Sequence, residues 1–215
     1  MSEPLPIWVC FAVVEEGRLF PEPDFVDVLF HGMGRENALR VIKSELAEHM
    51  PKLVLTCGFA GGLDPKLAPC SIVFSEDAAA GLGPRLLALG AVPARFHCAE
   101  RVVITAAEKA ELRRSTGADV VEMESQGIRE LCHQRGIPSA TIRVISDSAE
   151  ENLPLDFNAL MTGEKKIHFG RLAWQLVISP GKIPALLALQ KRTDAAARKL
   201  GELLVKLLAD DPRSG

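Results

Sequence analysis

Short apolar segments alternate with stretches of helical periodicity along the chain. Their Val, Ile and Leu content and the turn residues around them are typical of strands that are buried on both faces. The predicted strands are residues 7–14, 25–30, 53–57, 70–74, 118–121 and 140–145. Strands that alternate with helices predict the α/β class, here a three-layer α/β/α fold around a central mixed, mostly parallel sheet.

Apolar residues at helical spacing and capping signals predict five helices. Thr105 and Glu108 form a capping box, which fixes the start of one of them. The last helix places Ala196, Leu200, Leu203, Leu204 and Leu207 on one face. The predicted helices are residues 35–49 opening at Gly34, 105–115, 124–135, 165–177, and the segment after a Pro/Gly break at 179–184. No repeat or linker divides the chain, so residues 1–215 are expected to form a single domain.

The composition excludes several classes of protein. The chain has 215 residues, 47% of them hydrophobic, and a formal net charge of −3, which gives no basic surface for nucleic acid. Its five cysteines are an odd number without a CxxC pair, so neither a zinc finger nor a secreted disulfide framework is expected, and the cytoplasm fits best. The apolar run at 7–14 follows no basic residue and precedes two acids, unlike a signal peptide or membrane span. The histidine spacing predicts no metal, and no cofactor is expected.

Residues suited to chemistry follow the predicted strands. In an open parallel sheet this edge is where ligands bind. The five groups are Glu15-Glu16, His31 to Gly34, Gly58 to Gly62, Met123-Glu124 and Ser146-Asp147. The glycines either let the backbone approach a ligand or only make tight turns, and the opening of the helix at Gly34 offers N–H groups to an anion. No Rossmann or P-loop signature is present, which disfavours dinucleotides and nucleoside triphosphates.

Three acids, Glu16, Glu124 and Asp147, are expected in one cleft, with Arg18 and Arg143 as the nearest basic residues in sequence. Burial and like charge would raise the pKa of at least one of them, which suits a general acid. Each acid also has a structural alternative. Glu16 would be solvated beyond a strand, Glu124 would favour the positive end of its helix, and Asp147 would cap a helix or turn.

Three segments resemble the purine nucleoside phosphorylases and the methylthioadenosine/adenosylhomocysteine nucleosidases. TCGFAGGLDPKL at 56–67 is similar to the Gly-rich segment of that superfamily, VEMES at 121–125 to its ribose-binding segment, and RVISDS at 143–148 to its base-binding strand end. All three occur in the family order, and the resemblance covers residues 7–157. The tail, with Pro180 and IPALL from residue 183, resembles the hopanoid-associated phosphorylase branch.

The resemblance implies roles for the residues at the strand ends. Asp147 would protonate or hydrogen-bond N7 of a purine, oriented by Ser146, while Glu124 would hold the ribose hydroxyls and Met123 would pack on the sugar. Glu16 corresponds to the acid that activates water in the nucleosidases. Further substrate contacts are expected from backbone groups of Ala60 and Gly61 and from the rings of Phe59 and Phe157. If phosphate is the nucleophile, Gly34, Arg35 and Arg18 would anchor it.

The sequence therefore predicts an enzyme that cleaves the N-glycosidic bond of a purine nucleoside, with adenine preferred as the base. Phosphorolysis, with phosphate as co-substrate, is preferred to hydrolysis with Glu16 as base. A non-catalytic nucleoside-binding regulatory module is the alternative from another class. Two departures leave the nucleophile and the nucleoside open: residues 102–105 hold no aromatic to stack on the base, and the Gly-Asp-Pro-x-Arg start of many phosphorylases is missing. The resemblance also implies a homo-oligomer.

Overall fold

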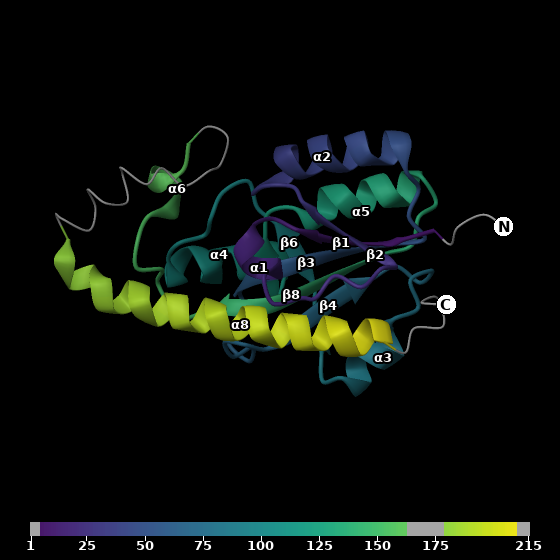
Figure 1. Cartoon of the computed structure of the whole chain (residues 1–215). Coiled ribbons are helices and arrows are strands. Elements are labelled where there is room, and N and C mark those ends of the chain that lie inside the picture. Colours follow the sequence, from purple (N-terminus) through teal and green to yellow (C-terminus); the bar gives the residue numbers. More distant parts are fainter. Residues whose placement is uncertain (1–4, 163–178, 210–215) are drawn as a thin grey trace.

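The computed structural model describes residues 5–162 and 179–209. Within these ranges eight strands form one sheet, and helices cover both of its faces (Figure 1). The strands are β1 (Ile7–Phe11), β2 (Val26–Phe30), β3 (Leu53–Gly62), β4 (Ile72–Glu76), β5 (Val92–Pro93), β6 (Phe96–Cys98), β7 (Val120–Glu122) and β8 (Ser139–Asp147). The helices are α1 (Val14–Gly17), α2 (Arg35–Glu48), α3 (Gly83–Ala88), α4 (Ala106–Thr116), α5 (Ser125–Gln134), α6 (Phe157–Leu160), the 3₁₀ turn η1 (Pro180–Lys182) and α8 (Ile183–Ala209).

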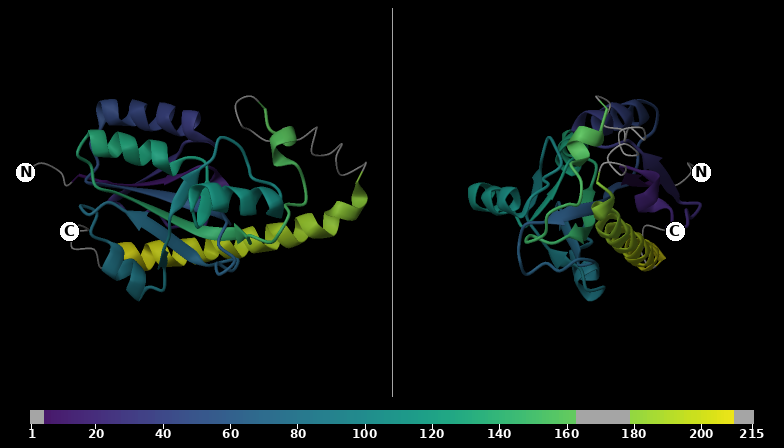
Figure 2. Two further views of the ribbon diagram at one scale, coloured as in Figure 1. Left: turned by 180° about the vertical axis from the view of Figure 1, so that it is seen from behind. Right: turned by 90° about the vertical axis from the view of Figure 1, so that its left-hand side faces the viewer.

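The sheet is mixed and mostly parallel, as predicted. Its strands run in the order β2-β1-β3-β8-β4-β5, and β7 and β6 branch from β3. The β3–β7 and β4–β8 pairs are antiparallel, and the other pairs are parallel. Helices α2 and α5 lie on one face and α8 on the other, which the end-on view in Figure 2 shows as three layers. The predicted three-layer α/β/α fold is therefore confirmed.

Strand β1 shows why the central strands are apolar throughout. Side chains alternate across a strand, and here both sets are buried. Trp8 and Cys10 pack with the helices α2 and α5, while Ile7, Val9 and Phe11 belong to the core under α8. The apolar face predicted for the last helix is confirmed, because Ala196, Leu200, Leu203, Leu204 and Leu207 are all buried in that same core.

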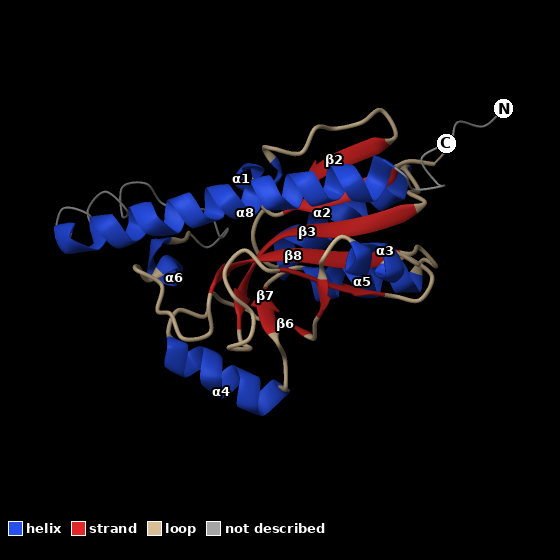
Figure 3. Ribbon diagram, turned by 90° about the horizontal axis from the view of Figure 1, so that it is seen from below, coloured by secondary structure: helices blue, strands red, loops and turns tan. Residues whose placement is uncertain are grey.

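Helix α8 differs between its two halves. Its C-terminal half crosses the sheet, as Figure 3 shows, whereas its N-terminal part extends beyond the ends of the strands. Ile183 and Leu187 in that part are 40% and 53% exposed. The long apolar helix thus does more than cover the core, because its first turns lie beside the site described below. In the two ranges that the structure describes, no helix is long and apolar enough to cross a membrane.

Two predicted strands are too short, because pairing continues through glycines. The prediction ended one strand at residue 57, but β3 runs to Gly62 and pairs with β8 and β7 along its second half. Strand β8 likewise includes Ser146 and Asp147. The Gly-rich segment and the Ser-Asp pair therefore lie inside strands rather than after them.

The other boundary differences have local causes. The strand predicted at 7–14 ends at Phe11, since the Glu16 carboxylate accepts the N–H groups of Ala12 and Val13 and turns the chain into α1. The strand predicted at 70–74 is shifted to β4, because Cys70 has a φ of 66°. Strand β7 starts two residues later than predicted, and Ala118 instead donates its N–H to Thr116 Oγ1.

The helices predicted at 35–49, 105–115 and 124–135 are confirmed as α2, α4 and α5 within one residue or two. Thr105 makes the expected capping box with Glu108. The helix predicted at 165–177 lies outside the described residues. The short elements α1, α3, α6, β5 and β6 were not predicted. The N-terminus of α3 is capped by a residue outside the helix: the Glu76 carboxylate accepts the N–H groups of Leu82 and Gly83.

Candidate functional site

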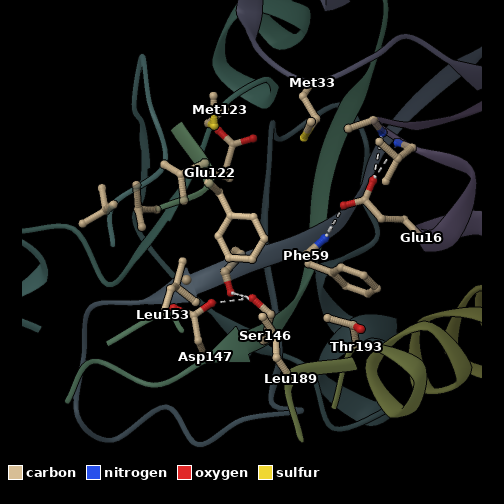
Figure 4. Close-up of a pocket in the computed structure, with 18 of the residues that line it drawn as sticks. Glu16, Met33, Phe59, Glu122, Met123, Ser146, Asp147, Leu153, Leu189 and Thr193 are labelled. Carbon is tan, nitrogen blue, oxygen red and sulfur yellow. Dashed lines mark hydrogen bonds between the residues drawn. The ribbon is translucent and has the colours of Figure 1, made fainter. Parts of the chain in front are cut away.

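A cavity of about 770 Å³ opens where the carboxyl ends of β1, β3 and β8 meet β7 and the first turns of α8. Figure 4 shows acidic and apolar side chains around it. Nine of the predicted site residues line this cavity: Glu16, Phe59, Ala60, Gly61, Met123, Glu124, Ser146, Asp147 and Phe157. Residues from five separate parts of the chain are thus brought together, as the strand-end argument predicts.

Glu16 contributes a buried carboxylate that three backbone groups hold in place. Its Oε2 accepts the N–H groups of Ala12 at 2.9 Å and Val13 at 3.3 Å, and its Oε1 accepts that of Phe59 at 2.9 Å. The residue is 8% exposed and faces the cavity. Burial raises the pKa of Glu16, although Arg143 and the three N–H groups act against this. A carboxylate in this position is suited to take a proton, and the alternative of a solvated acid is wrong.

Arg143 lies at the centre of a buried group of acids. Its Nη2 is 2.9 Å from Glu122 Oε2 and 3.6 Å from Glu124 Oε2, and all three side chains are less than a tenth exposed. Burial raises the pKa of Glu124 to about 7, where Arg143 acts against the shift and Glu122 adds to it. For Glu122 the effect of burial is outweighed by Arg143, which lowers the pKa. Neighbouring acids are thereby given different affinities for a proton.

Glu122 and Glu124 also accept backbone N–H groups at the starts of two helices, α5 and α2. Glu122 Oε2 accepts the N–H groups of Glu124 and Ser125 at 3.0 and 2.7 Å, and so caps the helix. Glu124 Oε1 accepts the N–H of Gly34 at 2.7 Å. The side chain that caps α5 is therefore that of Glu122, although Glu124 is the N-cap residue, and both acids line the cavity.

Gly58 is required because side chains fill the space around it. A Cβ at this position would lie 2.4 Å from Glu16 Oε1 and 2.9 Å from Arg143 Nη1, and φ is +146°. Gly61 is similarly close to Val121 and to Asp147 Oδ2, at 3.2 and 3.4 Å. Gly58 and Gly61 lie in β3, so the tight-turn alternative is wrong for them. The absence of a side chain at Gly58 leaves room for the side chains of Glu16 and Arg143.

Replacing Gly58 with Ala is expected to destabilise the protein by about 1–3 kcal/mol, because overpacking and an unfavourable φ act together. It should also displace Glu16. Urea unfolding measures the first effect. Gly90→Ala is the matched control, since Gly90 has a φ of +82° with nothing within 4 Å of its added Cβ. Equal losses of unfolding free energy in the two variants would show that the close contact with Glu16 does not contribute to the loss of stability.

Asp147 is held by a hydroxyl and an ammonium. Its Oδ1 accepts the O–H of Ser146 at 2.6 Å, and its Oδ2 accepts an N–H of Lys109 at 2.5 Å. Asp147 pairs with Gly61 at the end of β8, so the alternative of a helix cap is wrong. The nearest cations to the acids are thus Lys109 and Arg143, and not Arg18.

The three groups predicted to anchor phosphate do not gather at the cavity. Arg18 pairs with Asp194 at 2.5 Å, and Arg35 pairs with Glu130 at 2.8 Å, both on the exposed surface. The Gly34 N–H is occupied by Glu124. The phosphate site at these residues stays a prediction that this arrangement does not favour, because both arginines pair with carboxylates outside the cavity and the Gly34 N–H binds a carboxylate of the protein.

The remaining walls of the cavity are mostly apolar. Met123 and the rings of Phe59 and Phe157 line it, whereas residues 102–105 contribute the aliphatic Val102 and Val103. Four side chains of the first turns of α8 extend the apolar wall: Ile183, Leu186, Leu187 and Leu189. A ligand with a flat ring and a long apolar group would be in contact with these walls.

Several residues of the site were missed by sequence reasoning. Lys109 is fully buried although it is a charged residue between Glu108 and Ala110 on a helix. The available signal was the capping box, which fixes where α4 begins and therefore the position of Lys109 in its first turns. Glu122 was inside the VEMES segment, and its alternation with Glu124 was the available signal. Met33, Leu153 and the first turns of α8 line the cavity, but no local pattern distinguishes them from ordinary apolar residues.

The comparisons with known proteins agree with this arrangement. The model of the family described as the phosphorylase superfamily matches residues 91–177. Among solved structures, futalosine hydrolase of Helicobacter pylori strain 26695 is 15% identical with a TM-score of 0.70, over 96% of this chain and 98% of that chain. A 5′-methylthioadenosine/S-adenosylhomocysteine nucleosidase from Helicobacter pylori, with butyl-thio-DADMe-Immucillin-A, has the same identity and TM-score over 97% and 100%.

The nucleosidase from Colwellia psychrerythraea 34H in complex with adenine is 17% identical, with a TM-score of 0.68 over 96% of both chains. Likeness at these identities shows a shared fold. Together with the match of the family model, it confirms the resemblance of this chain to the phosphorylase superfamily.

Proposed function

We propose that this chain hydrolyses the N-glycosidic bond of a purine nucleoside whose 5′ position carries an apolar group. The observation that carries the proposal is the Glu16 carboxylate, which faces the cavity from a buried position. Such bonds break through a transition state with positive charge on the sugar, so an enzyme must stabilise that charge, activate a nucleophile and protonate the base. The site has a separate acidic residue for each of these tasks.

Glu16 acts as the base that takes a proton from water. Its raised pKa makes it a stronger base than an exposed glutamate, and its three N–H partners fix its direction. Glu124 accepts hydrogen bonds from the ribose hydroxyls, and Met123 packs on the sugar. The negative charge of the Glu124 carboxylate stabilises the positive sugar of the transition state.

Asp147 and Ser146 lie on another wall of the cavity than Glu16, as Figure 4 shows. From there they act on the base. Asp147 delivers a proton to N7 as the C–N bond breaks, and Ser146 fixes the orientation of its carboxyl group. Phe59 and Phe157 offer flat apolar surfaces to the purine. The resemblance to nucleosidases, one of them in complex with adenine, supports adenine as the preferred base.

Water is preferred to phosphate as the nucleophile because the arginines expected to bind phosphate form ion pairs with carboxylates of the protein. A phosphate dianion needs arginines or clustered N–H groups. Arg18 and Arg35 are engaged with Asp194 and Glu130 away from the cavity. Arg101 does line the cavity but pairs with Glu108 at 2.6 Å. This reverses the preference that the sequence suggested.

The proposal is tested by following adenine release from adenosine and from 5′-alkylthio-adenosines of increasing chain length, in buffers with and without phosphate. Release at the same rate in both buffers is expected, with a KM that falls as the alkyl chain grows and contacts the wall formed by α8. Release that requires phosphate would support phosphorolysis instead. Binding without release would support the regulatory module.

A further inference from the structure

Lys109 is a fully buried lysine at the back of the proposed site. Its ammonium donates three hydrogen bonds: to Asp147 Oδ2 at 2.5 Å, to the carbonyl of Ser148 at 2.6 Å and to the carbonyl of Glu151 at 2.9 Å. These use every N–H that a lysine has. Its side chain is 0% exposed, and that of Asp147 is 7% exposed. A charged pair at this depth is unusual, because apolar residues of similar volume often serve stability as well or better.

The position of Lys109 is fixed by the start of its helix. The N-terminus of α4 is held by the Thr105–Glu108 capping box and by an ion pair between Glu108 and Arg101 at 2.6 Å. Lys109 is the residue that follows Glu108, and it is the buried residue of α4. Helix α4 therefore presents one ammonium to the cavity wall at a defined place.

Asp147 connects this ammonium with the cavity. One carboxylate oxygen is bound to Lys109, while the other accepts the O–H of Ser146, and both Ser146 and Asp147 line the cavity. Lys109 itself does not line it. Any effect of Lys109 on a bound purine must therefore pass through Asp147 or through the segment after β8.

We propose that Lys109 is a positioning residue for release of the base, which holds Asp147 at the cavity wall and supplies the proton that Asp147 passes to the departing purine. This inference rests on the proposed function. It separates Asp147, which touches the base, from the group that stores the proton. The burial of Lys109 matters, because its ammonium is 0% exposed and reaches the cavity only through Asp147.

The proton transfer conserves atoms and charge. When the C–N bond breaks, its electron pair stays on the purine. An Nζ–H bond of Lys109 breaks as Asp147 gains that proton, and Asp147 gives a proton to a ring nitrogen of the purine. Asp147 ends as a carboxylate, Lys109 as a neutral amine and the purine as a neutral molecule. The attacking water gives one proton to Glu16, and after product release exchange with solvent returns a proton to Lys109 and removes one from Glu16.

The test compares two substrates that differ in their need for a proton. A purine nucleoside needs one, whereas the matching 4-nitrophenyl riboside with the same 5′ group releases a stable anion. Lys109→Gln, which retains hydrogen-bond donors for the carbonyls, is expected to lower kcat on the purine substrate by about 10²-fold or more and to change the nitrophenyl rate less than about threefold. Arg113→Gln is the control from the next turn of α4, where Arg113 pairs with Asp64 at 2.8 Å, and should leave both rates unchanged.

A double variant gives a second readout that avoids an unpaired buried charge. If Lys109 acts through Asp147, Lys109→Met should change kcat on the purine by less than about threefold when Asp147→Asn is already present. Equal losses on both substrates, or additive losses in the double variant, would overturn the role of Lys109 and leave the proposed function standing. A native protein that cleaves neither substrate would overturn the proposed function, and this inference with it.

Discussion

Replacing Glu16 with Gln is expected to lower kcat for base release by about 10²- to 10⁴-fold, the range found for loss of a general base. Gln has the same shape and can still accept the N–H of Phe59, but it cannot take a proton from water. Its amide NH₂ would face the N–H groups of Ala12 and Val13, which adds a smaller loss of stability. Steady-state rates with a 5′-alkylthio-adenosine measure the effect, and KM should change little.

Glu15→Gln is the matched control for this prediction. Glu15 is the neighbouring residue of α1 and is exposed. It should retain the native rate. A Glu16→Gln protein with native kcat would contradict the role of Glu16 and would mean that another group in the cavity activates the nucleophile.

Replacing Arg143 with Met is expected to destabilise the protein by about 3–5 kcal/mol, the usual effect of removing one partner of a buried ion pair. Arg143 is 1% exposed, and its removal leaves Glu16, Glu122 and Glu124 without their shared counter-charge. The free energy of unfolding in urea measures the effect. An exposed arginine such as Arg114, changed to Met, should leave this free energy nearly unchanged.

The double variant Arg143→Met with Glu122→Gln isolates the electrostatic part of that loss. Removing Glu122 together with its partner lowers the number of unpaired charges, while the amide oxygen of Gln can still accept the N–H groups at the start of α5. We therefore expect the double variant to be more stable than Arg143→Met alone. A double variant that is less stable than Arg143→Met would contradict the role of Arg143 as the counter-charge of the buried acids.

The edge of the sheet that carries the site was predictable because apolar runs and the residues near their ends are local features. The sequence brought Glu16, Glu124 and Asp147 to one edge, and the structure places all three on one cavity. The capping box of α4 was predictable for the same reason. The extension of β3 to Gly62 was not, because it depends on pairing with β7 and β8, which lie far away in the sequence.

The partners of the charged residues could not be predicted. Arg18 and Arg35 lie close in sequence to the cavity loops, yet each forms an ion pair with a residue more than ninety positions away. Lys109 meets Asp147 across 38 positions for the same reason. Such pairs depend on how helices pack on the sheet, which sequence spacing does not determine. The homo-oligomer expected from the resemblance stays a prediction.

The most direct test of the central claim is the origin of the oxygen on the released sugar. The reaction is run in oxygen-18 water with phosphate present, and the sugar product is analysed by mass spectrometry. Hydrolysis with Glu16 as base predicts free sugar with one oxygen-18 atom at C1, and loss of this product in Glu16→Gln. A sugar 1-phosphate without the label would contradict it.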